Sequence, residues 1–173
     1  LDEPVDELPA VQDFRWNRWA SSSTLGAILV WCLALTLLGL VAWPLTYVVM
    51  PHSRGRGYLF ARPLGWLFVG YVNWLLASLR WMKNSILTLW LGVLLLALLS
   101  WWLAWRRRGE LKLWLRAHWR FMLVCEALFG AAFLGFVAIR LLNPDLWQPW
   151  QGGEKFMEFA FLNAITRSPY FPP

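Results

Sequence analysis

Charged side chains are scarce in this chain. They make up 15% of its 173 residues, against roughly 25% in an average soluble domain, whereas 59% of the residues are hydrophobic and 15 are tryptophan. Apolar runs with so few charges indicate an integral membrane protein. The formal net charge of +6 would favour a nucleic-acid partner in a soluble protein. Here the basic residues stand beside the apolar runs, so membrane topology accounts for them and we expect no nucleic-acid partner.

Cysteine and metal-binding motifs are also lacking. Cys32 and Cys125 each lie inside an apolar run, so we expect two buried, unbridged thiols and neither a disulfide nor a metal site. The chain has no HxxxH or CxxC spacing and no glycine-rich phosphate loop. We therefore predict no metal ligands.

Four apolar runs are long enough for transmembrane helices, which need about 20 residues. They cover residues 25–50, 63–82, 85–105 and 121–142. Pro44 predicts a kink in the first run, and Asn73 predicts an interhelical hydrogen bond from the second. We expect an all-α integral membrane protein with three parts. These are a polar tail over residues 1–24, a four-helix transmembrane region over 25–142 and an outer segment over 143–173.

Two ionisable residues fall within the fourth run, Glu126 near its start and Arg140 near its end. Such residues are costly inside a membrane and mark functional sites. Both also lie near enough to an interface for the charged group to reach water, and the sequence leaves the two interpretations open. The preceding residues, 108–120, alternate basic and apolar side chains, which suits an amphipathic segment lying on an anionic leaflet.

The basic residues predict the orientation in the membrane. With four spans, the loops 51–62 and 106–120 share one side, and together they hold nine Arg or Lys residues and one acid, Glu110. The positive-inside rule places these loops in the cytoplasm. We therefore expect a multi-pass protein of the cell membrane with both termini extracytoplasmic.

The outer segment begins with Asn143-Pro144-Asp145, which ends the fourth run, and residues 154–166 predict a short helix. Thirteen residues are too few to cross a bilayer, and their apolar content is too high for a solvated loop, so we expect an interfacial helix. Glu154 and Glu158 would share one face of it. We expect Glu154 to face a polar cavity and Phe156, Phe159 and Phe161 to be buried in lipid or neighbouring helices.

The segment 143–165, NPDLWQPWQGGEKFMEFAFLNAI, and the following RSPYFPP resemble the signature of the YYY membrane-protein family, as do YLFARPLG at 58–65 and YVNWLLASL at 71–79. That family was catalogued as a domain of unknown function. It usually has Pro at the position of Phe156 and often Asp at that of Glu158. Its tyrosine triplet would lie beyond Pro173, so we expect this chain to be the amino-terminal part of a longer member.

The YYY family is similar in layout to the C-type glycosyltransferases (GT-C), polytopic enzymes that take a sugar from a polyprenyl-phosphate carrier on the extracytoplasmic side. The resemblance implies a carboxylate that deprotonates the acceptor, with Glu154, Glu158 and Asp145 as candidates. It also implies a cation that faces the phosphate, with Lys155, Arg167 and Arg140 as candidates, and it leaves a divalent metal open.

The same residues also fit roles without catalysis. A glutamate in the first turn of a helix stabilises the helix dipole, and Lys155 and Glu158 can simply pair on the surface. The competing class is a non-catalytic transmembrane subunit that packs against other subunits of a larger membrane complex. A transporter is a third class, but no run carries paired charges that favour it.

Overall fold

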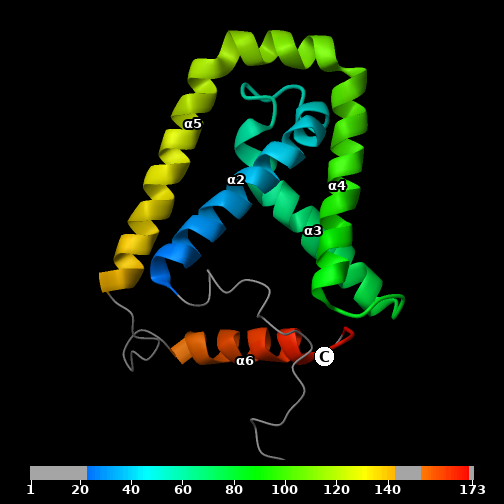
Figure 1. Ribbon diagram of the computed structural model, residues 1–173, viewed down its shortest axis with the longest axis vertical. Coiled ribbons are helices and arrows are strands. Elements are labelled where there is room, and N and C mark those ends of the chain that lie inside the picture. The colour runs from blue at the N-terminus through cyan, green and yellow to red at the C-terminus, as the bar shows by residue number, and fades with distance from the viewer. Residues whose placement is uncertain (1–22, 143–152, 172–173) are drawn as a thin grey trace, which may run out of the picture.

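The computed structural model describes residues 23–142 and 153–171. All regular structure in these ranges is helical, as predicted, and the elements in chain order are α2 (Thr24–Val49), η3 (Tyr58–Phe60), α3 (Ala61–Ser78), α4 (Ile86–Arg106), α5 (Arg108–Leu142) and α6 (Gly153–Arg167). Figure 1 shows α4 and α5 as two sides of an open frame, with α2 and α3 between them. Helix α6 lies across the end of this frame that is opposite the α4–α5 corner.

Three helices of the described residues are long and apolar enough to cross a membrane: α2, α4 and α5. The predicted second span, residues 63–82, corresponds to α3, which has 18 residues and ends at Ser78. It is shorter than the other three helices, and Arg62 and Asn73 make it less apolar. The structure thus supports a multi-pass protein with three candidate spans, where the sequence predicted four.

Helix α3 packs between α2 and α4 through a stripe of mostly small residues. Its buried residues recur at every fourth position: Ala61, Gly65, Val69, Asn73 and Ala77. This spacing places them on one face of the helix. A β-carbon built on Gly65 would lie 3.0 Å from that of Ala42 in α2, and one on Gly92 of α4 would lie 3.3 Å from the Val69 side chain. In a membrane the hydrophobic effect does not drive helices together, because lipid tails are as apolar as the side chains. Small residues then stabilise the contact by letting the helix backbones approach closely.

Helix α5 is bent near its first third. His118 has non-helical backbone angles of φ −119° and ψ 16°, and its Nδ1 lies 3.1 Å from the carbonyl oxygen of Trp114. In Figure 1 the part of α5 before the bend runs across the top of the frame and the part after it runs down one side. The bend coincides with the boundary that the sequence predicts between an amphipathic segment and a span.

The two halves of α5 differ in their packing. Its buried residues are Leu111, Trp114 and Cys125, all before or shortly after the bend. Further along, Phe136 is 74% exposed and Leu142 is 87% exposed. Helix α5 therefore joins the rest of the protein mainly near the bend.

The two cysteines are free thiols, which confirms that they are unbridged. Cys125 is buried, as predicted, whereas Cys32 is only half-buried. Cys32 lies between Gly26 and Gly39, in a stretch of α2 without a buried residue.

Candidate functional site

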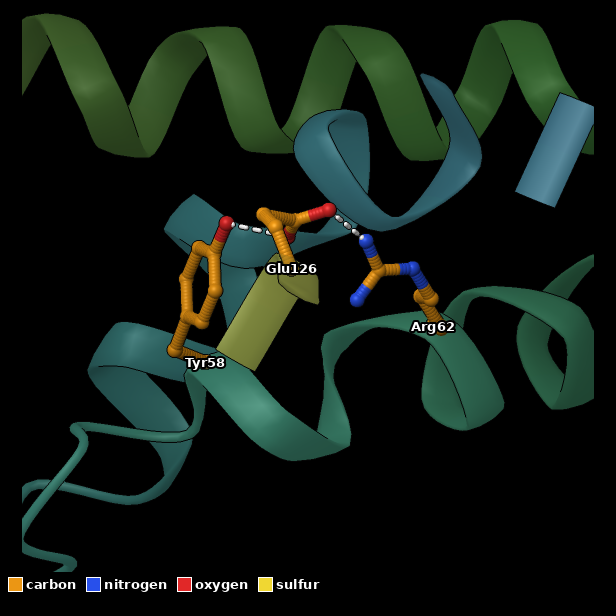
Figure 2. A network of polar contacts seen from close by, with 3 residues as sticks. All are labelled: Tyr58, Arg62 and Glu126. Atoms are coloured by element: carbon orange, nitrogen blue, oxygen red, sulfur yellow. Dashed lines mark hydrogen bonds and ion pairs between the residues drawn. The ribbon is translucent and has the colours of Figure 1, made fainter. Parts of the chain in front are cut away.

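A network of three polar side chains links the start of α3 to α5. The Tyr58 hydroxyl donates to Oε1 of Glu126 at 2.5 Å, and the Arg62 guanidinium pairs with Oε2 of the same carboxylate. Figure 2 shows Tyr58 and Arg62 pointing toward Glu126 from opposite sides. The Arg62 side chain is 13% exposed and that of Glu126 is 33% exposed. Of the two interpretations left open for Glu126, the structure thus favours a paired carboxylate within the protein over one that reaches water.

Arg62 reaches Glu126 by crossing α2 at a glycine. A β-carbon on Gly39 would lie only 2.6 Å from Cγ of Arg62. The guanidinium then lies over the ring of Phe129 in α5, with Cζ 3.9 Å from the ring centroid. A cation over an aromatic face is stabilised, more strongly where water is excluded. Nε of Arg62 is buried and has no hydrogen-bond partner among the described residues.

Tyr58 is positioned by a tight backbone turn and an aromatic cluster. Gly57 precedes it with φ 74°, and a β-carbon there would lie 2.6 Å from the Thr46 carbonyl oxygen, so the position requires glycine. The Tyr58 ring meets Trp43 edge-on at 6.1 Å, and Trp43 lies 5.4 Å from Trp114. Burial, followed by the hydrogen bond to Glu126, raises the pKa of the Tyr58 hydroxyl well above its usual value. Tyr58 therefore stays protonated and donates.

A pocket of about 590 Å³ opens beside this network at the bend of α5. Its lining is mostly apolar, and Tyr58, Arg116 and Glu126 add a hydroxyl, a guanidinium and a carboxylate. The other lining residues are Leu115, Trp119, Met122 and Leu123. Its volume falls within the range of about 300–1,000 Å³ that is usual for small-molecule sites. The network and this pocket together form the candidate site at the arginine-rich end of the protein.

Two of the predicted catalytic residues, Glu154 and Glu158, are on α6, at the opposite end. Asp145 lies outside the described residues. Glu154 lies in the first turn of α6, and its side chain is outside the described part. Glu158 is exposed on α6. The described residues hold no group of three or more His, Cys, Asp or Glu that could bind a metal.

The predicted phosphate-binding residues are spread over the same end. Arg140 is exposed in the last turn of α5, and Arg167 is exposed in the last turn of α6. Lys155 lies in the first turn of α6, and its side chain is outside the described part. Glu158 and Arg167 are nine positions apart, about 13 Å along a helix, so these two side chains do not form a direct pair.

Helix α6 is attached to the rest of the protein by Asn84 in the α3–α4 turn. The Asn84 backbone N–H donates to the Pro169 carbonyl oxygen at 2.7 Å. Its Nδ2 donates to the carbonyl oxygens of Ile165 at 2.8 Å and Ser168 at 3.2 Å. Asn73 completes the chain of contacts by donating to Oδ1 of Asn84 at 2.9 Å. The hydrogen bond predicted for Asn73 is therefore present, but its acceptor lies in a turn and not on a second helix.

The apolar side of α6 is open. Phe161 is 60% exposed, and Met157, Leu162 and Ile165 are also exposed. The sequence predicted that Phe161 is buried either in lipid or against neighbouring helices. Neighbouring helices do not bury it, so contact with lipid stays a prediction. The side chains of Phe156 and Phe159 lie outside the described part.

Sequence reasoning singled out Glu126 and missed both of its partners. From the sequence, Arg62 was used only as a basic residue of the 51–62 loop that indicates orientation. Tyr58 was used only as part of YLFARPLG, which resembles a family motif. Their four-residue spacing was the available signal, because it places both side chains on one face of a helix that begins there. That signal gives no indication of which distant carboxylate they meet.

No curated protein and no solved structure matches the chain. The family model described as "Uncharacterized membrane protein (DUF2298)" matches residues 68–173, which is more than half of the chain. The matched part contains most of α3, all of α4, α5 and α6, and Glu126 of the candidate site. The description agrees with the prediction of a membrane protein, and it assigns no activity. The chain belongs to this family of membrane proteins.

Proposed function

We propose that the chain is the amino-terminal part of a GT-C-like glycosyltransferase, which transfers a sugar from a polyprenyl-phosphate carrier to an acceptor. The observation that carries the proposal is the position of α6. This helix follows the last candidate span and lies across the end of the frame opposite the basic bend (Figure 1). Its 15 residues, about 22 Å in length, bring the exposed carboxylate of Glu158 to that end. Deprotonation of an acceptor requires a base such as a carboxylate beside it, and Glu158 is the exposed candidate there.

The two basic loops support the orientation that the proposal needs. Residues 50–57 and the first half of α5 lie at the same end of the protein (Figure 1), and a β-carbon on Gly55 would lie 2.9 Å from the ring of Phe121 in α5. The positive-inside rule then assigns this end to the cytoplasm and α6 to the outer side. In a cysteine-free background, His52→Cys should be labelled only after the membrane is permeabilised, and Ala160→Cys in intact cells. Labelling of His52→Cys in intact cells would contradict the orientation.

The proposed chemistry assigns a role to each group of residues on the outer side. One carboxylate, Glu154 or Glu158 with Asp145 as the third candidate, accepts the proton of the acceptor hydroxyl. A cation among Lys155, Arg140 and Arg167 faces the phosphate and stabilises the charge of the leaving group. The acceptor oxygen bonds to the anomeric carbon as the bond to the phosphate oxygen breaks.

The test uses the full-length protein in membranes, supplied with labelled polyprenyl-phosphate sugars. A general base contributes about 10²–10⁴-fold, so Glu154→Gln or Glu158→Gln should lower turnover by at least about 100-fold with expression unchanged. Glu110→Gln is the matched control, because it removes an exposed carboxylate at the basic end. Wild-type turnover by both α6 variants would remove the enzymatic interpretation of these glutamates.

The second candidate function is that of a non-catalytic subunit in a larger membrane complex. It is favoured by the open second half of α5, where a β-carbon on Gly130 or Gly135 would meet nothing within 4 Å. Ala131 and Gly135 are four residues apart, and small residues at this spacing often line contacts between membrane helices. Gly135→Leu should then release a co-purifying membrane protein, whereas a lipid-facing helix would tolerate it with no change in composition.

A further inference from the structure

The first half of α5 has a basic stripe on its outer face. Lys112, Arg116 and Arg120 are all exposed. Lys112 and Arg116 are four residues apart and share one face of the helix before the bend, and Arg120 follows the bend at His118. Leu111 and Trp114 are buried against the rest of the protein, which fixes the direction of the stripe. Such a stripe beside a bilayer is attracted to anionic headgroups.

Only Arg116 of this stripe lines the pocket at the bend. The acidic residue in the lining, Glu126, is neutralised by its ion pair with Arg62. Arg116 has no hydrogen-bond or ion-pair partner among the described residues. The pocket therefore presents one uncompensated positive charge at its rim, which selects an anion.

The remaining lining is apolar and reaches down the span. Trp119, Met122 and Leu123 continue from Arg116 along α5 across the bend. Trp119 is 52% exposed, and tryptophan is enriched at the headgroup level of membranes. The pocket thus has a positive charge at its rim and an apolar wall beside it, near the headgroup level of a membrane. These features are complementary to a molecule with an anionic head and a hydrocarbon tail.

We infer that this pocket binds one anionic phospholipid of the surrounding bilayer, with its phosphate at Arg116 and an acyl chain along Trp119, Met122 and Leu123. The site lies at the opposite end of the protein from α6 (Figure 1). It is therefore separate from the proposed sugar-carrier site, and it does not depend on that function. The bound lipid would fill the open space beside Tyr58 and Glu126 and hold the bend of α5 at the headgroup level.

The experiment is native mass spectrometry of the full-length protein released from micelles that contain phosphatidylglycerol or phosphatidylcholine. The wild type should retain one phosphatidylglycerol in preference to phosphatidylcholine. A basic residue at a membrane surface contributes about five-fold in affinity, so Arg116→Gln should weaken retention by about that factor or more. Lys112→Gln removes the same charge from the same face outside the pocket and should leave retention nearly unchanged. Leu123→Trp, which fills the apolar part, should also weaken it.

Three results would overturn the inference. Equal losses in Arg116→Gln and Lys112→Gln would show attraction to the whole basic stripe and no defined site. Equal retention of the two lipids by the wild type would remove the role of charge. Unchanged retention in Leu123→Trp would show that no acyl chain occupies the pocket. A thermal-unfolding measurement on each variant confirms that the protein remains folded.

Discussion

A β-carbon placed on Gly39 would lie 2.6 Å from Cγ of Arg62, closer than such atoms approach in proteins. The aliphatic part of Arg62 thus lies in a notch that α2 forms by lacking a side chain. Through this notch the guanidinium passes from α3 to Glu126 on α5. An ion pair between two helices therefore depends on a glycine in a third.

Gly39→Ala should displace Arg62 and weaken its pairing with Glu126. Overpacking of this kind costs about 1–3 kcal/mol in unfolding free energy. Unfolding of the protein in detergent measures the loss. Gly135→Ala on α5 is the control, because a β-carbon there meets nothing within 4 Å and alanine favours the helix. Equal stability of the two variants would mean that Arg62 can leave the notch at no cost.

A double-mutant cycle tests the pair itself. Glu126→Gln leaves the Arg62 guanidinium enclosed without its counter-charge, although Nε already has no hydrogen-bond partner in the described residues. Breaking a buried pair costs about 3–5 kcal/mol, and the 33% exposure of Glu126 places the expected loss at or below the lower end.

Adding Arg62→Gln to Glu126→Gln should restore part of that loss, because the uncompensated charge is then gone. Unfolding free energies of the wild type, the two single variants and the double variant give the coupling. Strictly additive losses would show that the two side chains do not interact.

Tyr58 should ionise only at a pH above the usual value for tyrosine, about 10. Burial, then the hydrogen bond to Glu126, raises the pKa of Tyr58 in the folded protein. The unfolded chain therefore releases this proton first as pH rises. The contribution of Tyr58 to stability is complete below about pH 10 and is lost above it.

Alkaline titration by tyrosinate absorbance, compared between the wild type and Tyr58→Phe, isolates this hydroxyl. Tyr71→Phe removes an exposed tyrosine and serves as the control. A difference curve for Tyr58 centred at or below pH 10 would contradict the buried hydrogen bond.

Asn84→Ala should release α6 from the α3–α4 turn. The substitution removes both side-chain hydrogen bonds to the end of α6 and leaves Nδ2 of Asn73 without its acceptor. Each lost hydrogen bond costs about 0.5–1.5 kcal/mol. Hydrogen exchange of residues 153–167 should therefore become faster, whereas exchange in α2 should be unchanged. The neighbouring Lys83→Ala, at an exposed side chain, should leave α6 protected. Equal protection in both variants would show that Asn84 does not hold α6.

The sequence by itself determined the class of protein and most of its helices. Apolar runs and their lengths are local properties, and they placed α2, α4 and the later part of α5 close to their observed bounds. The alternation of basic and apolar residues over 108–120 likewise predicted a segment separate from the span that follows, and the bend at His118 lies close to that boundary. The same local pattern identified α6 as a short helix and Glu126 as an unusual residue. It extended the second run to residue 82, whereas α3 ends at Ser78.

The tertiary structure alone decided which residues meet. Glu126 joins Tyr58 and Arg62 across 68 and 64 positions, and Asn84 meets Ile165 across 81. These contacts follow from where helices cross, and crossing depends on notches such as Gly39, Gly65 and Gly92, where the backbone or a long side chain can approach. Hydrophobic periodicity tells which face of a helix is apolar, but it carries no information on the partner of that face. The pocket at the bend arises only when η3 and the two halves of α5 are brought together.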